Sequence, residues 1–348
     1  GNPHSSTCSS LRQTIHLTPS PLDVALDRLG RPLRDLRISV TDRCNFRCRY
    51  CMPREEFGKS HDFIPKTEIL SYEEITNFVK ACEPLGLRKV RITGGEPLLR
   101  KDIHHLVRQL SSMDMEVALT TNGSLLENNA ADLAESGLSR VTISLDAIDQ
   151  EVHSKITDSK VSVTDILDGI SAAIRYELGP VKINCVVQRG VNEHQIPKLV
   201  RKFRGTGVIV RFIEFMDVGS TNGWTQGQVV PTSEIIDFLS SEFDLIPLAR
   251  KSASDVASRW AHSDDSGEIG FISSVSQPFC GDCVRARLSS DGKFFTCLFT
   301  TTGHDMSALI KSGGKTEVLT QSIEEVWSAR KDRYSEDRPS VAIPLPRV

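Results

Sequence analysis

The sequence has no long run of apolar residues. The longest candidates, such as 209–215, are interrupted by charged residues at Arg211 and Glu214, whereas a membrane-spanning helix needs about 20 predominantly apolar residues. The chain also lacks an excess of charge of either sign, since 45 acidic residues nearly balance 42 basic ones and the formal net charge is −3. We therefore expect no membrane segment, no nucleic-acid-binding surface and no anionic membrane partner.

Nine cysteines, an odd number, cannot all be paired in disulfides. A chain of 348 residues does not need disulfides to hold its core. The first ten residues are Ser-rich, carry only His4 as a source of positive charge and contain no long apolar core, so we expect no secretory signal. These features predict a reducing compartment, which is the cytoplasm or, alternatively, the mitochondrial matrix. A homodimer is one oligomeric state that the sequence leaves open.

Short β-rich segments alternate with amphipathic helices over most of the chain. Strands that alternate with helices indicate right-handed βαβ units with parallel pairing. Six such units predict an α/β fold, specifically an incomplete (βα)6 TIM-like barrel, with reactive groups on the loops at the carboxyl ends of the strands. The predicted strands are 37–41, 89–93, 117–121, 141–145, 182–187 and 210–216.

The pattern changes after about residue 218, which predicts three regions. A tail and lead-in over 1–34 precede the partial barrel over 35–218, and a C-terminal region follows over 219–348. Within that last region we expect a helix over 232–243 and a polar loop over 251–267. A hairpin turning at Asp291-Gly292 is also expected there, and it would carry Cys297 back towards Cys283.

Cys44, Cys48 and Cys51 stand at C-x3-C-x2-C spacing directly after the first predicted strand. Three thiolates on a short loop can hold three irons of a cubane cluster, which takes four protein ligands when it only transfers electrons. The fourth iron then stays open and can bind a small molecule. Close cysteines in an intracellular protein also fit a zinc site, so this spacing alone leaves both interpretations open.

A second triplet, Cys280, Cys283 and Cys297, lies in the C-terminal region. No fourth Cys or His is suitably placed near either triplet. A zinc protein or a ferredoxin-like electron-transfer or binding protein would need four ligands at each site. The two triplets therefore favour clusters that each have one open iron.

Gly94-Gly95-Glu96-Pro97 follows the second predicted strand. Two glycines allow the backbone to approach a ligand closely, and a carboxylate beside them can hold an ammonium group. The motif is an ordinary turn when it stands alone. Its position one βα unit after the cysteine loop favours a functional interpretation.

The cysteine loop followed by Gly-Gly-Glu-Pro resembles the radical S-adenosylmethionine (SAM) superfamily. Over about 35–334 the chain closely resembles one family within it, the GTP 3′,8-cyclases of molybdenum cofactor biosynthesis. The most specific segment is 279–299, which contains the second cysteine triplet. The other matching segments are 36–45, 91–97, 120–123, 144–146 and 211–216.

The resemblance implies two [4Fe–4S] clusters, with SAM on the open iron of the first and the guanine of GTP on that of the second. Cys44, Cys48 and Cys51 match ligands of the first cluster, and the second triplet matches those of the other. The positions that match SAM contacts are Tyr50, Gly94, Gly95, Glu96, Ser144 and Met216. The positions that match GTP contacts are Arg37, Lys89, Arg91, Thr120, Lys182, Arg211, Arg285 and Arg287.

The basic residues support this assignment independently. A triphosphate needs several cations, preferably Arg, whose guanidinium fork matches phosphate oxygens. Lys89 and Arg91 are two residues apart on one predicted strand and share a face, as do Arg285 and Arg287. A single Arg at a strand end is more often part of a surface ion pair. Convergence of basic residues from five segments favours phosphate binding.

The implied reaction is the SAM-dependent radical conversion of GTP to 3′,8-cyclo-7,8-dihydro-GTP. It needs an external electron donor, and the product passes to a downstream cyclic pyranopterin monophosphate synthase. We further expect Arg285 or Arg287 to act catalytically by stabilising charge that develops on the guanine or ribose. The alternative is a radical SAM peptide-modifying enzyme with an auxiliary cluster, but such enzymes usually carry more cysteines there and have less need of basic residues.

The chain departs from the family at its end. The family commonly ends in a Gly-Gly tail that reaches towards the active site, whereas this sequence stops at Pro346-Arg347-Val348. We expect truncation, with cluster binding retained and turnover reduced.

Several other residues receive no role. Cys82 lies on the apolar stripe of a predicted helix and Cys185 alternates within a predicted strand, so both are expected to pack in the core. Cys8 lies in the tail. The histidines without ligand spacing are His104, His105, His153, His194 and His304.

Overall fold

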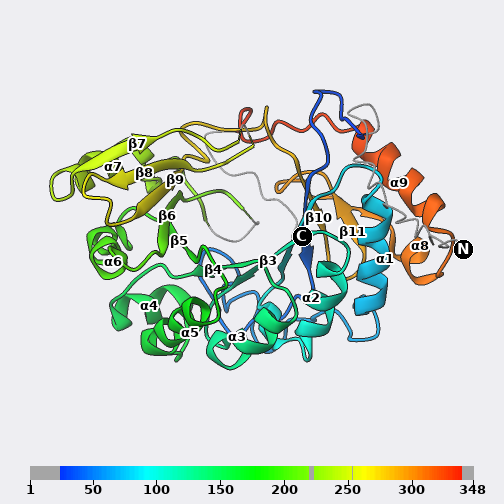
Figure 1. Ribbon diagram of the computed structural model, residues 1–348, viewed down its shortest axis with the longest axis horizontal. Coiled ribbons are helices and arrows are strands. Elements are labelled where there is room, and N and C mark those ends of the chain that lie inside the picture. Colours follow the sequence, from blue (N-terminus) through cyan, green and yellow to red (C-terminus); the bar gives the residue numbers. More distant parts are fainter. Residues whose placement is uncertain (1–23, 219–222, 253, 339–348) are drawn as a thin grey trace, which may run out of the picture.

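The computed structural model describes residues 24–218, 223–252 and 254–338, so the expectations for Cys8 and for the chain end lie outside the described part. In that part the strands form one sheet in the order β12-β11-β10-β1-β2-β3-β4-β5-β6-β9-β8-β7. Helices line the outer side of the sheet (Figure 1). The fold is therefore α/β with a parallel sheet at its centre.

The six predicted strands are confirmed, and they are neighbours in chain order. All adjacent pairs among them are parallel. In most of them the side chains alternate between buried and half-buried positions, which is why a period of two located them. The bounds are β1 Asp35–Ser39, β2 Lys89–Thr93, β3 Glu116–Thr121, β4 Arg140–Ser144, β5 Lys182–Val187 and β6 Ile209–Glu214.

The predicted helices between these strands also form. α1 begins at a capping box, where the backbone N–H of Glu74 donates to Ser71 Oγ at 3.1 Å and that of Ser71 donates to Glu74 Oε2 at 2.7 Å. One helix, α4 (Gln150–Thr157), was not predicted because it is short and mostly polar. The other bounds are α1 Tyr72–Cys82, α2 Ile103–Ser111, α3 Leu126–Glu135, α5 Val163–Arg175, α6 Ile196–Phe203 and α7 Thr232–Ser240, with 3₁₀ turns at Pro97–Leu99, Glu193–Gln195 and Gln226–Gln228.

The sheet continues beyond these six strands on both sides. β10 pairs in parallel with β1, and β9 pairs in parallel with β6. β11 and β12 extend the first side, and β8 and β7 extend the second, all by antiparallel pairing. The sheet thus crosses the boundary expected after residue 218, and the three-region division stays a prediction. The added strands are β7 Leu245–Leu248, β8 Ser258–His262, β9 Glu268–Ile272, β10 Arg285–Leu288, β11 Lys293–Phe295 and β12 His304–Asp305.

The expectation of a polar loop over 251–267 is wrong, because β8 lies within it. Four of the five residues of β8 are only half-buried, so the segment lacks the apolar period that marks a strand. The expected hairpin at Asp291-Gly292 is confirmed, since β10 and β11 pair across it. Gly292 has a φ of +93° there, a left-handed conformation that glycine adopts without steric cost.

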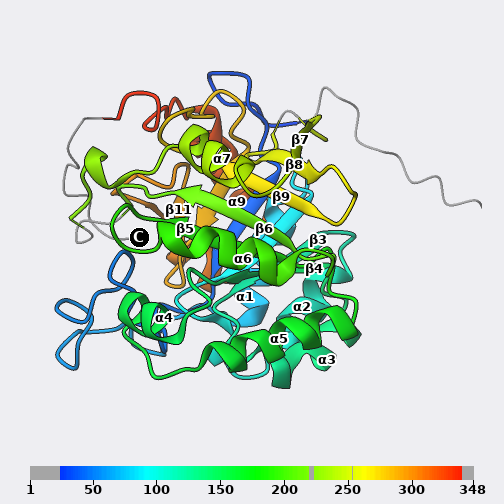
Figure 2. The same cartoon turned by 90° about the vertical axis from the view of Figure 1, so that its left-hand side faces the viewer.

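The remaining helices cover the β10–β12 side. α8 (Ser307–Lys311) and α9 (Thr316–Ser328) follow the last strand, and α9 packs against α1. Figure 2 shows α7 and β7 to β9 together on one side of the molecule, with α3 and α5 on the other. Cys82 and Cys185 are fully buried in the core, as predicted. None of the described helices is long and apolar enough to cross a membrane.

Glu214, the last residue of β6, ties the parallel strands to the segments that follow them. Its side chain is fully buried. The carboxylate accepts hydrogen bonds from the backbone N–H groups of Thr232 (2.7 Å), Val275 (2.9 Å) and Ser276 (2.8 Å). One side chain therefore fastens two later segments to the end of this strand.

We expect Glu214→Ala to lower the free energy of unfolding by about 3 kcal/mol or more, because each buried donor that loses its acceptor costs about 1–3 kcal/mol. Urea denaturation measures the change. Glu242→Ala is the control, since Glu242 forms an exposed ion pair with Arg201 and should change stability by less than about 1 kcal/mol. Equal losses in the two variants would contradict the role given to Glu214.

Candidate active site

The first cysteine loop, residues 44–51, leaves the carboxyl end of β1 and rests on α4. The backbone N–H of Arg47 donates to the carbonyl of Thr157 at 2.8 Å, and that of Arg49 donates to Ile156 at 3.1 Å. Carbonyls in the last turn of a helix have no partner within the helix. The helix that sequence reasoning missed therefore supports the cysteine loop.

The three thiols of this loop lie close to one another. Burial raises the pKa of Cys44 and Cys48, and it raises that of Cys51 to about 11. Thiolate charge on Cys44 further raises the pKa of both other thiols. Thiols that resist ionisation when free become thiolates on binding metal, since a thiolate is the ligand form and binding releases its proton.

The donor set of each triplet fits an iron–sulfur cluster. A cubane cluster places each thiolate on its own iron, so three thiols can serve three of its irons. All eight described cysteines are free thiols. The two triplets are therefore suited to hold iron–sulfur clusters.

Gly94 and Gly95 pack against the lead-in to the first cysteine loop. The backbone N–H of Gly95 donates to the carbonyl of Thr41, and that of Glu96 donates to Arg43, both at 2.8 Å. A Cβ on Gly95 would lie 2.2 Å from the carbonyl oxygen of Arg43. Glycine is thus needed at this position for close approach of the backbone itself.

The Glu96 side chain forms hydrogen bonds with other residues of the protein. Its carboxylate is fully buried and accepts hydrogen bonds from Thr121 Oγ1 and the Asn122 N–H, both at 2.7 Å, and from the Leu98 N–H at 3.0 Å. Burial raises its pKa. The carboxylate therefore holds the Gly-Gly turn to the end of β3. A contact with a ligand ammonium group stays a prediction.

Tyr50 is tied to Asp146, which sequence reasoning did not single out. The Tyr50 hydroxyl donates to Asp146 Oδ2 at 2.6 Å, and the N–H of Val186 donates to Oδ1 at 2.8 Å. Burial raises the pKa of Asp146 to about 6. The motif Ser144-Leu145-Asp146 contains this residue, so the signal was present in the sequence.

A cavity of about 560 Å³ opens beside the first cysteine loop. Arg49, Tyr50, Ile156 and Gln188 contribute to its lining. Its volume falls within the range of small-molecule sites.

The positions predicted to contact a small cofactor lie at the carboxyl ends of the parallel strands. Ser144 is the last residue of β4, and Met216 lies two residues after β6. They lie at the same edge as the first cysteine loop, because the carboxyl ends of parallel strands meet there. A contact between any of them and a cofactor stays a prediction.

The second cysteine loop, residues 280–283, directly precedes β10. The guanidinium of Arg285 donates from Nη2 to Cys283 Sγ at 3.3 Å and lies 5.0 Å from the centre of the Phe279 ring. Burial raises the pKa of Cys283, but the charges of Arg285 and Arg330 outweigh burial and lower that pKa to about 7. The arginine charges at this site therefore favour the thiolate form of Cys283.

The hairpin brings Cys297 back to this loop, as expected. Burial raises the pKa of Cys297, and the Cys283 thiolate raises it further. That effect requires the two sulfurs to be near each other. The second triplet is therefore assembled from a loop and from the strand end that returns to it.

The two triplets lie at opposite ends of the parallel strands. β10 runs parallel to β1 with Arg285 beside Asp35, so Cys283 precedes the start of this strand pair, whereas Cys44 follows its end. Five residues of strand rise by roughly 15 Å. The expectation that reactive groups lie at the carboxyl ends holds for the first triplet only.

Basic side chains line the face of the sheet between the two ends of the strands. Arg37 on β1 stands in register with Arg91 on β2 and with Arg287 on β10. Burial lowers the pKa of Arg37 well below its usual range, and Arg287 and Arg285 lower it further. Arg37, Arg285 and Arg287 thus form one cationic group next to the second triplet.

A second cationic group lies on β2, β4, β5 and β6. Burial lowers the pKa of Lys182 to about 8, and the nearby charges of Arg211, Arg140, Lys89 and Arg91 lower it further. Arg140 is a member that the sequence prediction missed.

Counter-charges and hydrogen-bond partners on this face are few. Lys89 contacts Asp35 at 3.8 Å and Glu116 at 3.6 Å, and Glu116 also pairs with Arg140. The predicted residue Thr120 accepts a hydrogen bond from Arg91 Nη1 at 3.1 Å. A face with more buried cations than acids is suited to bind a polyanion.

We expect the affinity for tripolyphosphate to fall as the pH rises from about 7.5 to 9.5. The folded pKa of Lys182 is about 8, so its charge is present below that pH and is lost as the pH rises through it. Calorimetric titration at a series of pH values measures the slope. Lys182→Met should bind more weakly at pH 7.5 and show a flatter profile, and an unchanged slope would contradict this role.

This chain is similar to known protein families and to individual proteins. The model for the radical SAM superfamily matches residues 38–203, and the model described as Molybdenum Cofactor Synthesis C matches residues 208–336. A GTP 3′,8-cyclase of Acidothermus cellulolyticus is 48% identical over 318 residues, which cover 90% of this chain and 88% of that protein. GTP 3′,8-cyclases of Staphylococcus epidermidis and Xanthomonas axonopodis pv. citri are each 46% identical, covering 91% and 90% of this chain and 94% of each relative.

Solved structures share the fold at low identity. A crystal structure of SuiB from Streptococcus suis bound to S-adenosylmethionine has a TM-score of 0.58 at 15% identity and covers 84% of this chain and 68% of SuiB. The enzyme anSMEcpe with AdoMet and a peptide has a TM-score of 0.53 at 18% identity and covers 86% of this chain and 85% of that one. These likenesses concern the fold alone.

Proposed function

This chain belongs to the GTP 3′,8-cyclase family of the radical SAM superfamily, and we propose accordingly that it converts GTP to 3′,8-cyclo-7,8-dihydro-GTP. This reaction is the first step of molybdenum cofactor biosynthesis. The single observation that best supports GTP as the substrate is the half-buried cationic face between the two cysteine triplets, because a triphosphate supplies the anionic charge that this face lacks.

The enzyme uses SAM and [4Fe–4S] clusters, and each triplet would hold one cluster. When bound, SAM and the first cluster would supply the radical chemistry that acts on the ribose. The chain's own part is to place the two ends of the substrate and to keep water out, since a free radical attacks what it contacts. Tyr50, Ser144, Met216 and the Gly94–Glu96 backbone are the proposed SAM contacts.

The two cationic groups divide the GTP contacts between them. Arg37, Arg285 and Arg287 lie next to the second triplet and are proposed to border the guanine and ribose. The other group, on β2, β4, β5 and β6, is proposed to hold the triphosphate. The predicted residues that form it are Lys89, Arg91, Lys182 and Arg211, with Thr120 beside them.

Arg285 and Arg287 are proposed as catalytic residues that stabilise charge developing on the guanine or ribose. The guanidinium of Arg285 lies against the Cys283 sulfur, and Arg287 is half-buried beside it, with a pKa that burial lowers to about 10. If Arg285→Ala and Arg287→Ala both kept full cyclisation while weakening only GTP binding, this role would be wrong.

The finer architecture and the cellular context are proposals too. We place the six central strands in an incomplete (βα)6 barrel, which the sequential parallel order supports. An external reductant delivers the electron, and a cyclic pyranopterin monophosphate synthase consumes the product. The bacterial relatives favour the cytoplasm, and a homodimer remains the proposed oligomer.

Anaerobic incubation with GTP, SAM and a strong reductant tests the function. We expect 5′-deoxyadenosine to form in step with the loss of GTP. Formation of 5′-deoxyadenosine without consumption of GTP would remove GTP as the substrate and leave the superfamily assignment intact.

A further inference from the structure

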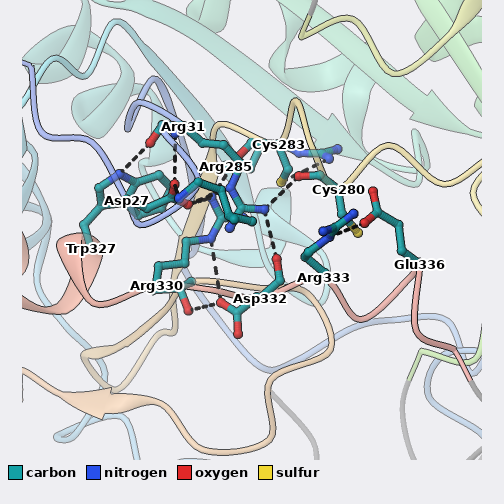
Figure 3. A network of polar contacts seen from close by, with 12 residues as sticks. Asp27, Arg31, Cys280, Cys283, Arg285, Trp327, Arg330, Asp332, Arg333 and Glu336 are labelled. Carbon is teal, nitrogen blue, oxygen red and sulfur yellow. Dashed lines mark hydrogen bonds and ion pairs between the residues drawn. The ribbon is translucent and has the colours of Figure 1, made fainter.

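Two buried arginines hold the backbone of the second cysteine loop. Arg31 Nη1 donates to the carbonyl of Cys280, and Arg330 Nη1 donates to that of Cys283, both at 2.7 Å. The two arginines come from opposite ends of the described chain and converge on two carbonyls of the same loop (Figure 3). Hydrogen bonds from a charged donor are the stronger kind, so both ligand positions are fixed through their own main chain.

Asp27 anchors both arginines. Its Oδ2 lies 2.6 Å from Arg31 Nε and 3.3 Å from Arg330 Nη1. The side chains of Asp27, Arg31 and Arg330 are 0%, 2% and 1% exposed. Buried charges persist only when they are paired, so the three groups depend on one another and cannot move separately.

The third ligand position is connected to the same network. Arg31 Nη1 also donates to the carbonyl of Asp332 at 2.9 Å. The Asp332 carboxylate accepts a hydrogen bond from Thr296 Oγ1 at 2.6 Å, and Thr296 directly precedes Cys297. Trp327 Nε1 donates to the carbonyl of Arg31 at 3.1 Å. All three cysteines of the second triplet are thus connected to this network.

The two arginines place their positive charges beside the loop, with Asp27 and Asp332 as counter-charges. Arg31 Nη2 and Arg330 Nε are buried and have no hydrogen-bond partner within the described residues, and Arg330 Nε lies 3.7 Å from Asp332 Oδ2. Neither arginine touches a cysteine sulfur, which distinguishes both from Arg285 and its contact with Cys283 Sγ. The two arginines would therefore act on a cluster through the backbone of the cysteine loop and through their charge.

We propose that Arg31 and Arg330, anchored by Asp27, are positioning residues of the second [4Fe–4S] cluster. They lock its ligand loop and raise its reduction potential, because a nearby cation stabilises the more negative reduced state. The proposal rests on the proposed function only in taking the second triplet as a cluster site. It does not depend on the identity of the substrate.

The test compares Arg330→Met, which removes the charge and the donor, with Arg330→Lys, which keeps the charge. Arg259→Met is the matched control, because Arg259 forms a half-buried ion pair with Glu268 on the far side of the sheet. Each variant of the full chain is exposed to a chelator under anaerobic conditions, and the retained iron is measured. The potential of the second cluster is then measured by EPR-monitored titration in a background that lacks the three first-loop cysteines.

We expect Arg330→Met to lose clearly more iron than the wild type but less than half of the total, from the second cluster only, and the second cluster that remains to titrate at a more negative potential. Arg330→Lys should restore the potential but retain less iron than the wild type, and Arg259→Met should match the wild type in both. Wild-type retention and potential in Arg330→Met would overturn the proposal. Equal loss of both clusters would also overturn it, because that would indicate general destabilisation. A failure of GTP turnover changes neither readout.

Discussion

Replacing Cys48 by Ser is expected to abolish both 5′-deoxyadenosine formation and GTP consumption, whereas Cys283→Ser abolishes only the second. A serine hydroxyl is a poor substitute for a thiolate on iron, so each variant loses one cluster. The two triplets stand at opposite ends of the strand pair formed by β1 and β10, and five residues of strand rise by roughly 15 Å. Loss of the second therefore leaves the first loop and its α4 support in place.

High-performance liquid chromatography of 5′-deoxyadenosine and GTP from one reaction measures both effects. Both signals should fall to the level without reductant in Cys48→Ser. Cys82→Ala is the control, because Cys82 is fully buried in α1 and contributes to packing, so its iron content should equal that of the wild type. Cyclisation by Cys283→Ser would show that the second triplet is not needed for the reaction.

Arg211→Met is expected to weaken GTP binding by about 10-fold to 100-fold. A hydrogen bond to a charged group contributes about 1.5–3 kcal/mol, and 1.4 kcal/mol corresponds to a factor of ten in affinity. Arg211 is buried among like charges, and its pKa is lowered by burial and then by Arg91 and Arg140. A bound triphosphate supplies the anionic charge that this group lacks.

Equilibrium binding of GTP and of guanosine distinguishes a phosphate contact from a general change in the site. Guanosine affinity should stay within about threefold of the wild type, because guanosine carries no phosphate. Arg204→Met is the control, since Arg204 forms an exposed ion pair with Asp264. Equal weakening of GTP and guanosine would indicate that Arg211 supports the shape of the site and does not bind phosphate.

Local sequence patterns predicted the six central strands. They could not predict the pairing of β10 with β1, which completes the site. Alternating burial in β1 and β2 and the capping box at Ser71 are properties of short segments. The hairpin at Asp291-Gly292 was predicted for the same reason. The pairing of β10 with β1 joins segments about 250 residues apart. The periodicity of a short segment carries no information about such a contact.

The missed site residues have separate causes. Arg140 was left out because the predicted strand began one residue late, at 141, and a boundary error of one residue removes a side chain from the lined face. Asp146 was present in a recognised motif but had no evident partner until Tyr50 was placed beside it. Arg31 and Arg330 gave no signal, because ordinary surface arginines have the same sequence context.

The parallel pairing of β10 with β1 also sets an order of events during synthesis. Until residues 285–288 have left the ribosome, β1 has an unpaired edge, and such edges invite wrong pairing. The first cysteine loop and α4 are made early and can meet while the chain is still growing. The second triplet is completed by Cys297, and Arg330 donates to the carbonyl of Cys283, so its cluster should be held fully only when nearly the whole described chain is available. Cluster insertion should therefore proceed from the first site to the second.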